Sequence, residues 1–154
     1  MKNGMVIFLN GTSSSGKTTI GKELQVRLND PYMLLTIDNF LNFYPEKFFI
    51  PKTPEEGVLL IKLLSAGISG FHRCIPALAG AGNNLIVDHV LQEKSWLQDC
   101  VKRWSGLDVL FVGVKCPLEV LEKREVERGD RKPGTSRYQY DRVHSHERYD
   151  LELD

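Results

Sequence analysis

The sequence has no excess of charge of either sign and few cysteines. Its 154 residues include 20 basic and 20 acidic side chains, so no overall positive field exists to recruit nucleic acid or an anionic membrane. The three cysteines, Cys74, Cys100 and Cys116, form no CxxC pair of the kind that binds zinc or does redox chemistry. We therefore expect reduced, mostly buried thiols, and neither nucleic acid nor a membrane among the partners.

Long apolar runs are also lacking. The run from Met5 to Leu9 is too short for the core of a signal peptide, and it leads directly into a glycine-containing loop. No other segment is expected to cross a membrane. The default expectation is a cytoplasmic protein with a single domain over residues 1–154, because a second core would leave each half too little apolar surface to bury.

The sequence does contain apolar runs that alternate with helical patterns. Short apolar segments indicate strands at 5–9, 32–37, 85–87, 108–114 and 149–153. Apolar spacings of three and four indicate helices at 17–28, along 61–78 and around 96–104, with further helices after Pro117 and Gly134. This order predicts an α/β fold in which helices cover both faces of a parallel sheet.

One loop motif carries the chemistry. Gly11-Thr-Ser-Ser-Ser-Gly16-Lys17-Thr18 matches the pattern GxxxxGK[ST] and lies between a predicted strand and a predicted helix, as a phosphate-binding P-loop does. The glycines permit tight turns that point backbone N–H groups at phosphates, aided by the helix dipole. Lys17 would reach the β- and γ-phosphates, and Thr18 would ligate Mg²⁺. The alternative is a Ser-rich turn that merely caps a helix.

The nucleotide is expected to be ATP. Neither the G-x-G-x-x-G spacing of a dinucleotide-binding loop nor an NKxD guanine-reading motif occurs in the chain. The residues expected to bind the nucleotide are Gly11, Ser13, Ser14, Ser15, Gly16, Lys17, Thr18, Thr19 and Arg124.

Two aspartates follow predicted strands, where open α/β sheets bind their ligands. Asp88 would hold Mg²⁺ together with Thr18, and Asp38 would accept the proton of an acceptor hydroxyl. Each could instead be a helix N-cap. His89, next to Asp88, is expected to be structural or solvated rather than catalytic.

Three arginines lie near a break in the pattern at Gly129. Arg124, Arg128 and Arg131 would form a closing lid that supplies cations to the transferred phosphoryl group, with Arg128 and Arg131 as catalytic residues. Alternatively, they pair on the surface with the acidic residues at 125, 127 and 130.

Other candidates carry less weight. His144 and His146 are expected to be solvated, because two histidines on a polar helix with no third ligand make a poor metal site. The aromatic residues from Phe40 to Phe49 could equally belong to the core or to the wall of an acceptor pocket.

The chain resembles the chloramphenicol phosphotransferase-like family of P-loop kinases. The matching segments are Ile7–Thr18, Ile37-Asp38, Leu85–Asp88, Asp108–Val114, Glu127-Arg-Gly-Asp-Arg131, Val143-His144 and Tyr149-Asp150. The resemblance implies a P-loop NTPase fold, a three-layer α/β/α sandwich with a five-stranded parallel sheet. It also implies that ATP phosphorylates a primary hydroxyl of the antibiotic with Asp38 as the base. Such proteins usually continue into a further helix beyond the point where this chain ends, at Asp154.

The function predicted from these features is ATP-dependent phosphorylation of a small-molecule hydroxyl. Two alternatives stay open: a P-loop kinase that acts on another metabolite or a sugar nucleotide, as toxin-like kinases do, and an ATP-binding switch or ATPase with no acceptor. The sequence does not define the oligomeric state.

Overall fold

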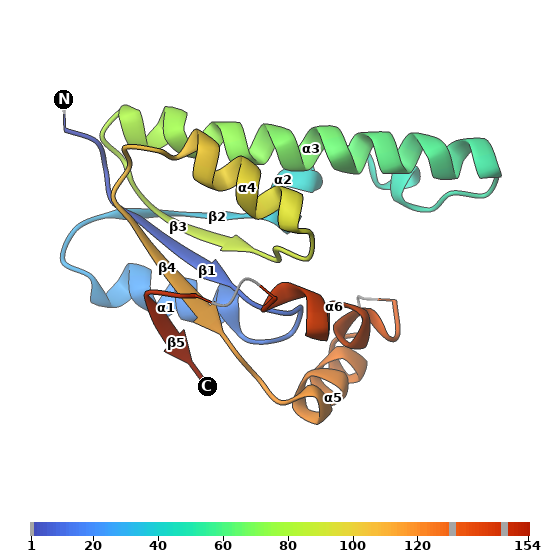
Figure 1. Cartoon of the computed structure of the whole chain (residues 1–154). Helices are drawn as coiled ribbons and strands as arrows, with labels where there is room; N and C mark the ends of the chain where they lie inside the picture. The colour runs from blue at the N-terminus through green and yellow to red at the C-terminus, as the bar shows by residue number, and fades with distance from the viewer. Residues whose placement is uncertain (1, 130–131, 146–147) are drawn as a thin grey trace.

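The structure, a computed structural model, describes residues 2–129, 132–145 and 148–154 (Figure 1). Its strands form one five-stranded sheet in the order β2-β3-β1-β4-β5, and every neighbouring pair is parallel. The strands are β1 (Val6–Asn10), β2 (Tyr32–Thr36), β3 (Asn84–His89), β4 (Val109–Val114) and β5 (Leu151–Leu153). The predicted α/β fold with a five-stranded parallel sheet is confirmed.

Helices connect the strands. They are α1 (Lys17–Arg27), α2 (Ile37–Leu41), the short 3-10 helix η1 (Glu46–Phe49), α3 (Pro54–Gly80), α4 (Lys94–Arg103), α5 (Leu118–Arg128) and α6 (Thr135–Val143). Figure 1 shows α3 and α4 on one side of the sheet and α1 on the other. The sheet is therefore the middle of three layers.

Strand β1 explains why this sheet is covered on both faces. Val6 and Phe8 pack into the cluster that α3 and α4 complete, whereas Ile7 and Leu9 pack into the cluster that includes residues of α1. Because successive side chains of a strand point to opposite faces, a fully apolar strand needs a helix on each side.

Helix α3 differs from its prediction at the N-terminal end. Its C-terminal half buries Ile68, Phe71 and Ile75 against the sheet, but Ile61 is 69% exposed, so the apolar stripe does not contact the core over its whole length. We expected no segment that could cross a membrane, yet α3 is long and apolar enough to do so by length and composition alone. Figure 1 shows the N-terminal part of α3 projecting beyond the sheet and its C-terminal part lying along it. Of its most apolar stretch, 28% is buried inside the protein.

Candidate active site

The loop between β1 and α1 adopts a conformation that only certain residues permit. Gly16 has a φ of 100°, and Ser14 has a φ of 67° in the left-handed region, although it carries a side chain. Gly11 is needed for a different reason, because a Cβ there would collide with the carbonyl oxygen of Val114. The structure thus supports the predicted tight loop, and Ser14 holds local strain of a kind found at ligand-binding sites.

Lys17 and Thr18, at the start of α1, both contact Asp88. The Nζ atom of buried Lys17 lies 3.7 Å from Asp88 Oδ1 and donates a hydrogen bond to the carbonyl oxygen of Thr12 at 2.9 Å. The Thr18 hydroxyl donates to Asp88 Oδ2 at 2.5 Å. These contacts arise because β1 and β3 are neighbours, with Leu9 of β1 in register with Asp88. Asp88 lies inside β3 rather than after it.

Two buried hydroxyl groups in the loop have no hydrogen-bond partner within the described protein. They belong to Ser14 and Ser15. A buried polar group without a partner is destabilising, and exceptions in native structures commonly mark a binding function. The arrangement suits a ligand that brings its own oxygen acceptors into the loop.

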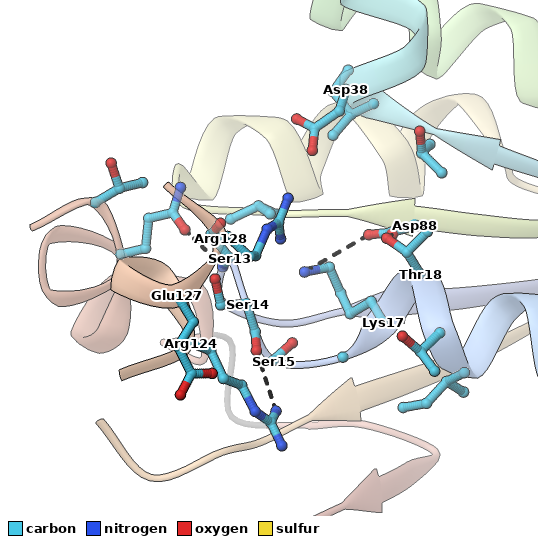
Figure 2. Close-up of a pocket in the computed structure, with 18 residues that line it drawn as sticks. Ser13, Ser14, Ser15, Lys17, Thr18, Asp38, Asp88, Arg124, Glu127 and Arg128 are labelled. Atoms are coloured by element: carbon cyan, nitrogen blue, oxygen red, sulfur yellow. Dashed lines mark hydrogen bonds and ion pairs between the residues drawn. The ribbon is translucent and has the colours of Figure 1, made fainter. Parts of the chain in front are cut away.

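The loop opens into a cavity of about 580 Å³ (Figure 2). Its lining residues are Ser13, Ser14, Ser15, Gly16, Lys17, Thr18, Thr19, Ile20, Thr36, Ile37, Asp38, Asp88, Val90, Arg124, Glu127, Arg128, Thr135 and Gln139. No aromatic side chain is among them. For the aromatic residues from Phe40 to Phe49, two alternatives were open, the core or the wall of an acceptor pocket. Phe40 packs against Phe71 of the core, whereas Phe43 is 81% exposed.

Asp38 reaches the cavity from α2 rather than from the end of β2. The sequence predicted a strand through Ile37, but β2 ends at Thr36, whose hydroxyl accepts a hydrogen bond from the Asn39 N–H at 3.0 Å and caps α2. Thr36, not Asp38, is the N-cap. Figure 2 shows Asp38 on the opposite side of the Lys17–Asp88 pair from Ser15.

Packing against α3 fixes α2 in place. A Cβ at Gly67 would come within 2.6 Å of the Leu41 side chain, and a Cβ at Gly70, in the next turn, would lie 3.5 Å from the Phe40 ring. The Asp38 backbone is therefore held by the core even though its side chain is exposed.

The arginines of α5 have different positions. Arg124 donates to the carbonyl oxygen of Ser14 at 3.3 Å, so its guanidinium lies against the loop. Figure 2 shows Arg128 extending over the cavity beside Lys17. Arg131, the third predicted arginine, lies outside the described residues. Arg124 and Arg128 both line the cavity.

Glu125, between these arginines, fastens the start of α6. The carboxylate is only 5% exposed and accepts hydrogen bonds from the N–H groups of Gly134 and Ser136, both at 2.6 Å. Burial acts to raise the pKa of Glu125, but the hydrogen bonds from Ser136 and its neighbours outweigh it, and the pKa is lowered. The alternative that the arginines form surface ion pairs with Glu125 is wrong, because this carboxylate is buried and holds the start of α6.

Replacing Glu125 should destabilise the protein. Glu125→Ala leaves two N–H groups at the start of α6 without an acceptor, and we expect the free energy of unfolding to fall by about 2 kcal/mol. Urea denaturation would measure this fall against Glu119→Ala, which removes an exposed carboxylate from the same helix. Equal stability of the two variants would show that the anchor has no energetic importance.

Asn10 joins three segments at the base of the loop. Its side-chain oxygen accepts from the Leu91 N–H at 2.9 Å, and its amide nitrogen donates to the Val143 carbonyl at 2.9 Å and to the Tyr149 hydroxyl at 2.8 Å. Asn10 is fully buried, so each of these bonds is shielded from water. It connects the strand before the P-loop with the end of α6 and with the loop after β3.

A second network of hydrogen bonds begins at His89, the residue after Asp88. His89 Nδ1 accepts from the Val90 N–H at 2.8 Å, so in the neutral ring Nε2 carries the proton and donates to His72 Nε2 at 2.9 Å. His72 Nδ1 then donates to Asp99 at 3.0 Å, and Asp99 pairs with Arg103. Burial lowers the pKa of both histidines, which keeps the rings neutral. Of the two expected alternatives, a structural or a solvated His89, the structure shows a buried, hydrogen-bonded side chain.

The neutral state of His72 makes stability depend on pH. Because its pKa is lowered on folding, the unfolded chain takes up a proton below about pH 6.5 that the folded chain does not. We expect the free energy of unfolding to decline as pH falls from 7 to 5. The slope should exceed that of His72→Gln by up to roughly 1.4 kcal/mol per pH unit. Parallel profiles from denaturant titrations would contradict the prediction.

His144 also differs from its prediction. It is half-buried and its Nδ1 lies 2.8 Å from the Tyr149 hydroxyl, so it belongs to the structure near Asn10 rather than to solvent. His146 lies outside the described residues. No group of three or more His, Cys, Asp or Glu side chains in the described parts of the chain could hold a metal ion.

Sequence reasoning missed three residues that shape the site: Asn10, Glu125 and Gln139. A polar residue at the end of an apolar strand was a signal for Asn10. Glu125 and Gln139 carried no signal, because polar residues on a polar helix usually face solvent.

Comparison with known proteins identifies the family. The model of the chloramphenicol phosphotransferase-like protein family matches residues 4–154. A Mycobacterium tuberculosis protein, provisionally named an O-phosphotransferase in two strains, is 32% identical over 171 residues, covering 100% of this chain and 76% of the relative.

Solved structures share the fold at low sequence identity. An APS kinase from Mycobacterium tuberculosis in complex with AMPPNP and APS has a TM-score of 0.71 at 16% identity, over 99% of this chain and 89% of that one. A gluconokinase from Sinorhizobium meliloti has a TM-score of 0.63 at 16% identity, over 100% and 84% of the two chains. The chain therefore belongs to the chloramphenicol phosphotransferase-like family, and it is a P-loop phosphotransferase.

Proposed function

We propose that the protein is a cytoplasmic kinase, a single P-loop domain over residues 1–154, that transfers the γ-phosphoryl group of ATP to a hydroxyl of a small molecule. The observation that carries this proposal is the shared lining of one cavity. A phosphate-binding loop with Lys17 and Arg128 lies on one part of it, and the carboxylate of Asp38 lies on another. A donor site and an acceptor base can therefore act on the same reacting atoms.

The loop would hold the phosphates of ATP. The backbone N–H groups at the start of α1 and the positive end of this helix favour anionic oxygens there. The buried hydroxyls of Ser14 and Ser15 can donate to the same oxygens, which would satisfy them. Arg124, which lines the cavity and donates to the Ser14 carbonyl, would contact the nucleotide.

Thr18 and Asp88 would hold Mg²⁺. A hydroxyl and a carboxylate that already meet at 2.5 Å offer the oxygen ligands that this ion prefers, and phosphate oxygens and water would complete its coordination. When bound, the ion neutralises charge that develops on the β- and γ-phosphates.

Asp38 would act as the general base. As the acceptor oxygen forms its bond to the γ-phosphorus, the bond between that phosphorus and the leaving ADP oxygen breaks, and the hydroxyl proton moves to the Asp38 carboxylate. Lys17 and Arg128 would stabilise the charge on the transferred group. Catalysis would consist mainly of positioning and electrostatic stabilisation.

Chloramphenicol is the first acceptor to test, because the family is named for its phosphorylation. If it is accepted, the protein would confer resistance to that antibiotic. Another metabolite or a sugar nucleotide is the competing class of acceptor, and an ATPase without an acceptor is the competing activity.

A library screen tests the proposal. Purified protein is incubated with ATP, MgCl₂ and a library of hydroxyl compounds that includes chloramphenicol and sugar nucleotides, and mass spectrometry detects the gain of one phosphoryl group. We expect one compound class to gain phosphate with wild type and none with Lys17→Ala. If no compound gains phosphate while ATP is hydrolysed, the protein is an ATPase and the proposal is wrong.

A further inference from the structure

Helix α6 is held by contacts with α5, with β1 and with the nucleotide loop. Glu125 holds its start through the Gly134 and Ser136 N–H groups, and Asn10 holds its end through the Val143 carbonyl. Near the start, the Ser136 hydroxyl lies 3.4 Å from the carbonyl oxygen of Ser13. These contacts hold the helix at a fixed position beside the loop.

Gln139 lies on this helix and lines the cavity. Its side-chain amide meets the backbone N–H of Ser13 at 2.9 Å. Because an N–H group can only donate, the atom it meets must be the amide oxygen. The hydrogen bond from the Ser13 N–H therefore fixes the orientation of the Gln139 amide, with its oxygen toward the loop.

The other end of this amide carries two N–H donors. The side chain is half-buried and lines the same cavity as Lys17 and Arg128, so its donors would add to those two cations. The transition state of phosphoryl transfer spreads negative charge over three equatorial oxygens in a planar arrangement, and donors fixed in the right orientation stabilise it. A neutral, oriented amide suits such an oxygen.

We propose that Gln139 is a further catalytic residue, whose side-chain N–H groups donate to the oxygens of the phosphoryl group during transfer. This inference rests on the proposed function, since it places the transferred group beside the loop. Ser13 serves as a positioning residue for Gln139, and Asn10 and Glu125 hold the helix that carries it.

Two variants distinguish the two roles of the Gln139 side chain, which are to donate hydrogen bonds to phosphate and to accept the hydrogen bond of the Ser13 N–H. Gln139→Leu removes both the acceptor of the Ser13 bond and the donors. Gln139→Glu keeps an oxygen acceptor for Ser13 but has no N–H donor. Asp141→Asn, an exposed change on the same helix, is the matched control.

The probe is a fluorescent ADP analogue with MgCl₂, titrated with and without aluminium fluoride, which mimics the planar phosphoryl group in transfer. The measured quantity is the gain in affinity that aluminium fluoride produces, so an effect of a substitution on ADP binding alone cancels. Because the carboxylate of Gln139→Glu could also repel the fluoride complex, a loss in that variant counts as support only if the uncharged Gln139→Leu shows it too. Thermal melting confirms that each variant is folded.

We expect wild type and Asp141→Asn to show the full gain, and both Gln139 variants to lose about tenfold or more of it. An undiminished gain in Gln139→Glu overturns the inference, whether or not Gln139→Leu loses it, because anchorage alone would then account for the residue. If wild type itself gains no affinity, the proposed phosphoryl transfer at this site fails, and that outcome is distinct from a failure confined to Gln139.

Discussion

Lys17→Ala should reduce kcat/KM by about a thousandfold or more. Lys17 is 5% exposed and lies between the Thr12 carbonyl and Asp88, at the floor of the cavity. In such an enclosed site a cation stabilises phosphate oxygens far more than it would in water, and no bulk solvent replaces it when it is removed. Steady-state kinetics with the acceptor found by the screen would measure the loss.

The control for this variant is Lys22→Ala, which removes an exposed lysine from the same helix. It should leave kcat/KM near the wild-type value. If the two variants have similar activity, Lys17 does not contact the transferred group and the loop binds nucleotide in another way.

Asp38→Ala should slow transfer by roughly a hundredfold to ten-thousandfold while ATP binding stays unchanged. The carboxylate lies on α2, away from the loop that would hold the phosphates, so its removal affects the acceptor and not the donor. Separate measurement of nucleotide affinity and of kcat would show this division.

Asp30→Ala is a suitable control because Asp30 is exposed and does not line the cavity. Normal turnover in Asp38→Ala would exclude Asp38 as the base. The conservative variant Asp38→Asn also tests the alternative of a nucleotide-dependent switch, since a switch should not need this carboxylate.

The sheet and the P-loop could be predicted because both depend on local patterns. The apolar run of β1 requires a helix on each face, and the glycines at 11 and 16 occupy positions that a side chain would disrupt. The position of Asp38 was less predictable. Thr36 caps α2 one residue before the strand was expected to end, so a local hydrogen bond to the Asn39 N–H ends the strand there, and packing against α3 holds the helix that follows.

The contacts that complete the site join residues far apart in the sequence. Asn10 bonds to the Val143 carbonyl, and Gln139 bonds to the Ser13 N–H. In neither pair is the separation along the sequence one that a single strand or helix would bring into contact. Both hydrogen bonds form only because α6 lies beside the loop. The position of α6 beside the loop could therefore not be predicted from the sequence and is known only from the structure.

The most direct test of the proposed function is the stoichiometry of phosphoryl transfer. ATP labelled at the γ-phosphate is incubated with the protein, MgCl₂ and the acceptor from the screen, and ADP, labelled product and inorganic phosphate are quantified together. We expect one labelled phosphate ester for each ADP formed, with little inorganic phosphate. ADP formation at the same rate without acceptor, with all of the label released as inorganic phosphate, would contradict it.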